Sequence, residues 1–383
     1  MTPKLPQIAP LLFFASTIMG CGDSPASPVP VDSRLGVSVQ WNERSVALIV
    51  ARQPTSNGQA AVSRILTYVS LAQYRAVVAA QTAGGSRPPA AAAAVAGASV
   101  AVLNAFVPAD TAASGAQLRA DLASLSTPFD ARFDIAAGEA LGRTIGAAVL
   151  AQSAQDNYLT VSVGTPPAGA QYWRSSAAAI VRSLHGTKPF FLTSAAQLRP
   201  PPPPVVGSAA YTSALAEVRQ IADTRTSDQT ALALFWNTSS GTFTAGALNL
   251  KADSVLRGHN SNELEAARIL AFANAAAFDA QIACWDAKVN YWYIRPSQAD
   301  TAIKLAIALP NHPSYPSGHS CITGGIMGVL ADAFPSDRAT FERWVDDAGL
   351  SRVYGGIHFR FDIEAGRDIG RAAAALALRG SLR

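Results

Sequence analysis

The chain has 383 residues, a length that suits one large domain or two ordinary ones. Its 30 Lys and Arg against 26 Asp and Glu give a formal net charge of +4, and because no run of like charges is present, a nucleic-acid partner has little support. Only 15% of the residues are charged and 49% are apolar, many of them alanine, which excludes intrinsic disorder for most of the chain. Because alanine favours helix, we expect an all-α protein with a sizeable core.

The first residues have the features of an export signal followed by a linker. The apolar stretch at residues 11–20 is too short to span a membrane and runs into residues 18–21, Ile-Met-Gly-Cys, which resemble a bacterial lipobox. We therefore expect a signal peptide with a lipobox at residues 1–21, a lipid anchor at Cys21 as the sole membrane contact, and a flexible linker at residues 22–35. An ordinary signal peptide with an incidental cysteine is the alternative. Lipidation predicts an exported protein of the cell envelope, an outer-membrane or periplasmic lipoprotein.

Helical periodicity dominates residues 36–250, which we expect to form an N-terminal helical region. The clearest patterns cover residues 62–74, 136–154 and 211–224. Residues 90–107 carry no charge but consist mainly of alanine, which gains little from lipid, so a buried core helix is expected there rather than a membrane span. The five prolines at residues 200–204 cannot be helical and predict an extended spacer between helical layers.

Residues 251–383 form the second predicted region, with sharper helix boundaries. The predicted helices run from an N-cap at Ser261 to Ile294, from residue 317 to about 333, from 341 to 349, and from 358 to the C-terminus. Pro296 ends the first of them, because proline disfavours helical geometry in the residue before it. Cys284 and Cys321 make neither a disulfide framework nor a zinc site, so we expect two buried thiols.

Two motifs in this region gather groups that could bind an anion. Lys288 and Arg295 are seven residues apart, which is two turns of a continuous helix, so both cations would project to one side. Residues 316–319, Pro-Ser-Gly-His, follow a proline-rich loop and open a helix, where free amides and a hydroxyl can cradle an oxyanion and glycine allows close approach. Taken singly, the first motif also fits a solvated helix face, and the second a capped turn.

A third motif combines Arg352, His358 and Asp362. Arg352 supplies a second guanidinium for bidentate oxyanion binding. His358 and Asp362 are four residues apart, so on a helix the carboxylate can hold one ring nitrogen and leave the other as a nucleophile or a ligand. Alone, this spacing also fits a structural His–Asp pair.

Together the three motifs resemble the signature of one superfamily, the type 2 phosphatidic acid phosphatases and vanadium-dependent haloperoxidases. That signature is a lysine, six residues, then Arg-Pro; next Pro-Ser-Gly-His; and last Ser-Arg, five residues, His, three residues, Asp. The chain matches it at residues 288–296, 316–319 and 351–362. Trp285 and the His-Pro-Ser-Tyr at residues 312–315 are similar to the bacterial haloperoxidase branch, and this resemblance spans roughly residues 36–383. Ile294 departs from it, because haloperoxidases often have tryptophan at that position.

The resemblance implies helical bundles with the active site in a C-terminal phosphatase/haloperoxidase-type bundle, the catalytic core at residues 251–383, and vanadate as the cofactor. His358 would be the metal ligand. The implied cofactor-binding residues are Lys288, Arg295, Ser317, Gly318, His319, Arg352 and His358, and the implied catalytic residues are His319, His358, Lys288 and Asp362. His319 would take protons from hydrogen peroxide, and Lys288 would polarise the peroxide for attack by a halide, which yields hypohalous acid.

The substrates implied are hydrogen peroxide, a halide and an organic acceptor. His312 near the motifs favours bromide or iodide over chloride. Asp279, on the helix that carries Lys288, is expected either to support the site or to serve as a structural carboxylate. The sequence sets no oligomeric state.

Two other functions compete with the haloperoxidase interpretation. A soluble acid phosphatase would use the same atoms, with His358 attacking phosphorus to form a phosphohistidine and His319 protonating the leaving group. Phosphate and vanadate share a tetrahedral shape, so the residues that contact them do not choose between the two, and the flanking segments favour haloperoxidase. A non-enzymatic oxyanion-binding lipoprotein would be expected to lack one of the two histidines, and both are present.

Overall fold

The computed structural model describes residues 36–52, 58–160, 164–175, 184–237 and 242–382. The expected signal peptide, lipobox, Cys21 and linker lie outside the described residues. Within the described ranges there is no β-strand, only isolated bridges between Pro89 and Asp134 and between Tyr172 and Tyr293. The all-α prediction is therefore confirmed.

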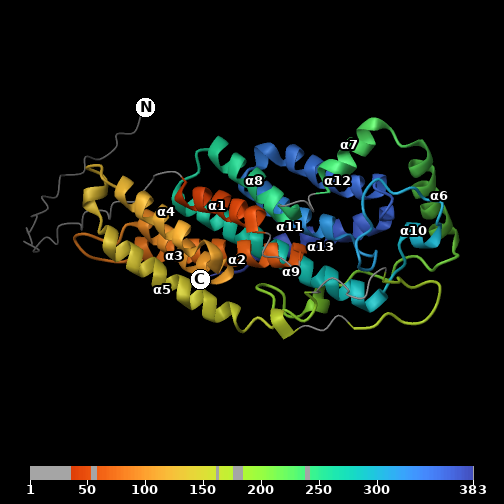
Figure 1. The fold of residues 1–383 in the computed structure, drawn as a ribbon, viewed down its shortest axis with the longest axis horizontal. Helices are drawn as coiled ribbons and strands as arrows, with labels where there is room; N and C mark the ends of the chain where they lie inside the picture. Colours follow the sequence, from red (N-terminus) through yellow and green to blue (C-terminus); the bar gives the residue numbers. More distant parts are fainter. Residues whose placement is uncertain (1–35, 53–57, 161–163, 176–183, 238–241, 383) are drawn as a thin grey trace, which may run out of the picture. The chain divides into compact units, whose positions relative to one another are not determined.

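The helices follow one another along the chain as labelled in Figure 1. The first group is α1 (Val37–Arg52), α2 (Gly58–Thr82), α3 (Ala91–Phe106), α4 (Thr111–Ser124) and α5 (Ile135–Ser153). The second group is α6 (Ala209–Thr224), α7 (Ser227–Phe235) and α8 (Phe243–Gly258). The third group is α9 (Glu263–Tyr291), α10 (Pro296–Ala299), α11 (Gly318–Ala333), α12 (Arg338–Tyr354) and α13 (Arg360–Arg379).

The Ala-rich stretch predicted as a core helix is α3, and it is buried along most of its length. It packs against α5, whose glycines Gly138, Gly142 and Gly146 face it. A Cβ on Gly138 would lie 2.5 Å from the carbonyl oxygen of Ala90, so only glycine allows this approach. No helix in the described ranges is long and apolar enough to cross a membrane.

Helix α9 is the central element and is buried on nearly every face between α2, α11 and α13 (Figure 1). The contact with α11 is especially close, because a Cβ on Gly325 would lie 2.8 Å from Ala277 Cα. A helix that is apolar all round needs such partners on all sides. This packing holds α9 and α11, which carry two of the three motifs, in fixed positions.

The proline run is attached to the third group of helices through three tyrosine hydroxyls. Tyr291 donates to Pro200 O at 2.7 Å, Tyr315 to Pro201 O at 2.8 Å, and Tyr293 to Pro204 O at 2.6 Å. The carbonyls of this extended segment have no intrahelical partner, so the tyrosine hydroxyls satisfy them. The extended spacer is therefore bound along its length.

Asp279 does not support the site but anchors the segment before the prolines. Its carboxylate accepts hydrogen bonds from the amides of Phe190, Phe191 and Leu192 at 2.8, 2.7 and 3.1 Å. These contacts support the expectation that Asp279 is a structural carboxylate.

Several predicted helix boundaries were wrong. Asn262, not Ser261, caps α9, with its side chain accepting from Glu265 N at 3.0 Å. The helix ends at Tyr291 because Trp292 adopts a left-handed conformation with φ 48°. Helix α12 is longer than the predicted 341–349. Helix α8 includes residues 250 and 251, and the division there into an N-terminal region and a catalytic core stays a prediction.

Candidate active site

A cavity of about 320 Å³ lies beside α9, α11 and α12. Its walls include five of the residues that the sequence motifs predicted, namely Lys288, Gly318, His319, Arg352 and His358. Three further predicted residues lie in the same cluster: Arg295 contacts His358, Asp362 contacts His358, and Ser317 precedes Gly318. All three motifs therefore converge on one place.

Lys288 and Arg295 meet at the site for a reason other than helical phase. The helix ends between them, and Arg295 has extended geometry with φ −84° and ψ 151°. Lys288 Nζ donates to the carbonyl oxygens of Pro313 at 2.8 Å and Ser314 at 2.9 Å, and also to that of Pro316. Burial lowers the pKa of Lys288 to about 8 and that of Arg295 to about 10.

Arg295 ties the loop before α11 to the loop before α13. Its Nε donates to His312 O at 3.0 Å, and its Nη1 donates to Ile357 O at 2.7 Å. Its Nη2 donates to His312 Nδ1 at 3.0 Å. The guanidinium is fully buried and orients both histidine-bearing loops at once.

Arg352 enters from the last turn of α12. Its Nε donates to Ser351 Oγ at 2.9 Å and its Nη2 to Ala233 O at 2.9 Å, while Nη1 makes no hydrogen bond to any described residue. Burial, together with the charge of Arg295, lowers its pKa to about 9. One face of this guanidinium is thus left for an anion in the cavity.

The ring of His358 is held in a single tautomer. Arg295 Nη1 lies 2.9 Å from His358 Nε2, and because a guanidinium can only donate, Nε2 accepts. The proton therefore sits on Nδ1, which donates to Asp362 Oδ2 at 2.8 Å. Burial, with the charges of Arg295 and Lys288, holds the pKa of His358 well below its ordinary value. A neutral imidazole with its lone pair on Nε2 can act as a metal ligand or as a nucleophile.

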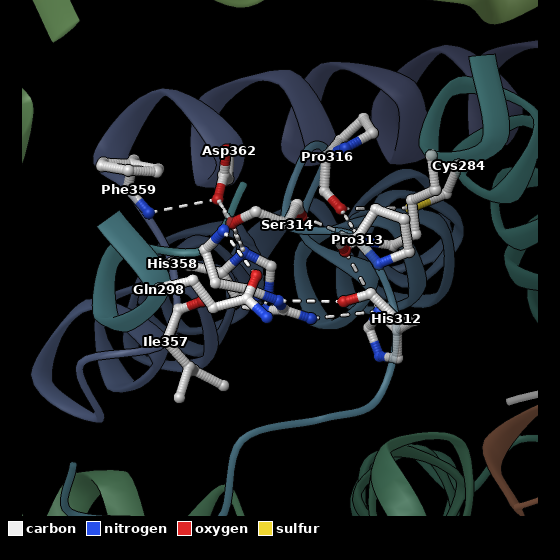
Figure 2. A network of polar contacts seen from close by, with 12 residues as sticks. Cys284, Gln298, His312, Pro313, Ser314, Pro316, Ile357, His358, Phe359 and Asp362 are labelled. Atoms are coloured by element: carbon white, nitrogen blue, oxygen red, sulfur yellow. Dashed lines mark hydrogen bonds and ion pairs between the residues drawn. The ribbon is translucent and has the colours of Figure 1, made fainter. Parts of the chain in front are cut away.

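Asp362 accepts three hydrogen bonds on one oxygen, as Figure 2 shows. Oδ2 accepts from Ser314 Oγ at 2.5 Å and from Phe359 N at 3.1 Å, besides His358 Nδ1. Oδ1 is buried and has no partner among the described residues. Burial raises the pKa of Asp362 to about 6, against the hydrogen bond from Ser314 and the charges of Lys288 and Arg295.

The N-terminus of α11 lines the cavity through Gly318 and His319. Ser317 is the N-cap, yet its Oγ is buried and makes no hydrogen bond within the described part of the chain. A Cβ on Gly318 would meet no atom within 4 Å. His319 Nε2 lies 3.0 Å from Trp236 O, a pure acceptor, so Nε2 carries the proton and Nδ1 the lone pair. Burial and Arg352 hold the pKa of His319 well below its ordinary value.

These residues fit a tetrahedral oxyanion. A buried hydroxyl without a partner normally needs a ligand or water, and Ser317 presents one beside the open face of Gly318. The first amides of α11 and its positive dipole end favour a negative charge there. Three buried cations around one cavity repel each other unless an anion compensates them.

Two residues outside the three motifs also belong to the site. Ser314 joins the site through its bond to Asp362 and through its carbonyl, which Lys288 contacts. Only its place in the His-Pro-Ser-Tyr segment could have indicated this. Trp285 packs its ring 5.0 Å from that of His312, and both line the cavity, which gives it an aromatic wall.

Comparison with known proteins gives a family match for the C-terminal part of the chain and several structures of similar fold. Residues 266–382 match the PAP2 superfamily. The structure of the first bacterial vanadium-dependent iodoperoxidase is similar with a TM-score of 0.75 and 22% identity, over 91% of this chain and 98% of that chain. An apo-type bacterial vanadium-dependent chloroperoxidase gives 0.69 and 14%, over 84% and 95%. A holo-type bacterial chloroperoxidase gives 0.64 and 16%, over 91% and 93%. The chain therefore carries a PAP2 superfamily domain and has the all-α fold of the bacterial vanadium-dependent haloperoxidases.

Proposed function

We propose that the protein is a vanadate-dependent haloperoxidase, which oxidises a halide with hydrogen peroxide to hypohalous acid. The observation that carries the proposal is a cradle of three buried cations: Lys288 and Arg352 line one cavity with His358, and Arg295 contacts His358. Next to it, the buried Ser317 hydroxyl has no hydrogen-bond partner within the described residues. The likeness to haloperoxidase structures over 91% of the chain, well beyond the PAP2 match, adds support. When bound, vanadate supplies an electrophilic centre that activates peroxide without changing its own oxidation state.

Each residue of the cradle has a role that follows from its chemistry. His358 Nε2 would be the metal ligand, with Asp362 holding the proton on Nδ1 so that Nε2 keeps its lone pair. Lys288, Arg295 and Arg352 would neutralise the oxyanion charge. Ser317 Oγ and the Gly318 amide would donate further hydrogen bonds to the oxyanion.

His319 is suited to accept a proton. Its Nε2–H is held by Trp236 O, which leaves the lone pair of Nδ1 free of that contact. Its lowered pKa keeps the ring neutral, so it can remove a proton from hydrogen peroxide and return it to a leaving oxygen. Lys288 would then stabilise negative charge that develops on the peroxide oxygen.

We further propose bromide or iodide as the preferred halide, acting on an organic acceptor. His312 and Trp285 line the cavity and offer a polarisable wall with a ring N–H. The similarity to a bacterial iodoperoxidase is consistent with this preference.

The second candidate is a soluble acid phosphatase. It is favoured by the PAP2 match and by the tautomer of His358, whose Nε2 lone pair could equally attack phosphorus. His319 would then protonate the leaving oxygen.

One pair of assays separates the two functions. The protein is loaded with orthovanadate and assayed for bromide- and peroxide-dependent halogenation, and in parallel for hydrolysis of a phosphate monoester without vanadate. A haloperoxidase is activated by vanadate and inhibited by phosphate, whereas a phosphatase is inhibited by vanadate and yields a trappable phosphohistidine at His358. His358→Ala should weaken orthovanadate binding, while His319→Ala should keep binding and lose turnover. Efficient ester hydrolysis without halogenation would reverse the assignment.

For the compartment, we propose export and lipidation at Cys21. The basis is the lipobox-like sequence at residues 18–21. Cell fractionation of the full chain and of Cys21→Ala tests it: the wild type should be in the membrane fraction, and the variant should not. Recovery of both in the same membrane fraction would contradict lipidation.

A further inference from the structure

Two thiols belong to one buried cluster beside the cavity, and the proposed reaction uses neither of them. Cys284 on α9 and Cys321 on α11 are free and buried, with exposed fractions of 1% and 0%. The neighbouring Cys321 thiol lowers the pKa of Cys284, and Cys284 raises the pKa of Cys321. Both side chains belong to one small apolar cluster in which α9, α11 and α13 meet.

Helices α9 and α11, which carry the two cysteines, pack closely against each other. A Cβ on Gly325 would lie 2.8 Å from Ala277 Cα, so the backbones of α9 and α11 nearly touch there. Cys284 lies two turns after Ala277 in α9, and Cys321 lies one turn before Gly325 in α11. A disulfide needs Cα atoms about 4.4–6.8 Å apart. Between two helices, this separation requires close packing of the kind seen for α9 and α11.

The two cysteines differ in their access to the cavity. Cys284 lines the cavity wall next to Trp285 and Lys288, and its sulfur also donates to Pro316 O at 3.7 Å. Cys321 is fully buried, is not among the lining residues, and belongs to the same apolar cluster as Cys284. A small oxidant in the cavity therefore meets Cys284 first, with Cys321 next to it in the same buried cluster. This is the arrangement of an attacking and a resolving thiol.

We propose that Cys284 and Cys321 are a redox pair that hydrogen peroxide converts into a disulfide. The Cys284 sulfur attacks one peroxide oxygen, the O–O bond breaks, and the thiol proton leaves with the released hydroxide as water. The Cys321 sulfur then attacks the sulfenic sulfur of Cys284, the S–O bond breaks, and the second thiol proton leaves with that hydroxyl as water. The sum is two thiols and one peroxide giving one disulfide and two waters. A thiol reductant reverses it.

The step requires hydrogen peroxide but neither vanadate nor halide, so it goes beyond the proposed function and is tested separately from it. Its effect is to consume peroxide at the cavity wall and to join α9 to α11 covalently. The ring that closes holds residues 284–321, the segment that carries Lys288, Arg295 and Ser317.

The test is peptide mapping of the vanadate-free full chain after treatment with about a tenfold molar excess of hydrogen peroxide and an acid quench. We expect a cross-linked peptide pair containing Cys284 and Cys321, two hydrogens lighter than the free peptides and lost on reduction. Two free thiols after this treatment, or a cross-link to Cys21 instead, would overturn the proposal.

Two matched variants test the order of reaction. In Cys321→Ala, Cys284 should stop at the sulfenic acid, which dimedone traps. In Cys284→Ala, Cys321 should stay reduced, and its oxidation at the wild-type rate would refute the assigned roles. If either variant fails to fold, the wild-type map still decides. A disulfide without halogenation overturns only the proposed function, and halogenation with both thiols free overturns only this inference.

Discussion

Asp362 accepts the Nδ1 proton of His358 at 2.8 Å and so keeps a lone pair on Nε2, which accepts a hydrogen bond from Arg295 Nη1 at 2.9 Å and could instead bind a ligand. The contact links two residues four apart that flank the start of α13. Ser314 and Phe359 N hold the same oxygen of Asp362, so the carboxylate cannot rotate away. The charge and the hydrogen bonds of Asp362 can therefore be separated by substitution.

Asp362→Asn should keep the hydrogen bonds and remove the charge. The three donors select the amide oxygen at the Oδ2 position, and the amide nitrogen then occupies the unpartnered Oδ1 position. We expect orthovanadate affinity to fall about 10- to 100-fold, as for other residues that orient a metal-binding histidine. Stability should fall by about 1–3 kcal/mol because the buried amide lacks an acceptor. Calorimetric titration and thermal unfolding measure the two effects.

The matched control is Asp279→Asn. Asp279 is equally buried and accepts three backbone amides, but it contacts residues 190–192 rather than a histidine. It should lose at least as much stability, because both of its oxygens accept and the amide nitrogen would face a backbone N–H, and it should keep wild-type affinity for orthovanadate. An equal loss of affinity in both variants would show that destabilisation, not the His358 contact, is responsible.

Gly318→Ala should block the anion and leave the fold intact. The added Cβ meets no protein atom within 4 Å, and alanine is a better helix residue than glycine. The melting temperature should stay the same or rise, while orthovanadate affinity falls about tenfold or more as the methyl fills the space beside the α11 amides. Unchanged affinity would place the anion elsewhere.

Gly325→Ala on the same helix is the contrasting variant. Its Cβ would lie 2.8 Å from Ala277 Cα, so α9 and α11 would have to separate. Overpacking of this kind costs about 1–3 kcal/mol. Thermal unfolding should therefore detect Gly325→Ala, and anion titration should detect Gly318→Ala.

Ser314→Ala tests a residue that the motifs did not include. Its hydroxyl donates to Asp362 Oδ2, so its removal leaves that buried carboxylate with one donor fewer. We expect a stability loss of about 1 kcal/mol and weaker orthovanadate binding by titration. Ser320→Ala is the control, because the buried Ser320 hydroxyl has no partner within the described residues and its loss should be near neutral. Equal behaviour of the two variants would exclude a positioning role for Ser314.

The sequence was enough to predict which residues form the site, but not how the chain brings them together. Residue type and spacing were enough to bring Lys288, His319 and His358 to one cavity. The reasoning for Arg295 was wrong, because it assumed a continuous helix from Lys288 to Arg295. The helix ends at Tyr291, four residues before Arg295. Helix phase cannot reveal a left-handed residue such as Trp292, because tertiary packing and not local preference imposes that conformation.

The fold shows the same division between local and long-range information. Alanine content and periodicity were sufficient for α3, α5, α6 and α11, whose patterns are local. The role of Asp279 depends on a partner segment 87–89 residues away in the chain. Likewise, the tyrosine bonds to the proline carbonyls join segments that no periodicity connects.

The last prediction concerns pH and Lys288. Burial lowers the pKa of its ammonium from 10.5 to about 8, so the cradle loses a positive charge as the pH rises through 8. Sulfate is a suitable probe, because it is a tetrahedral dianion whose charge is constant over this range. Its affinity should be level below pH 8 and fall by up to about tenfold per pH unit above it, with uptake of a proton on binding, since a bound anion raises the pKa of Lys288. Titration calorimetry in buffers of different ionisation enthalpy measures both quantities. Lys288→Arg keeps its charge and should remove the break at pH 8. A wild-type affinity that stays level to about pH 9 would mean that Lys288 does not titrate in the free site.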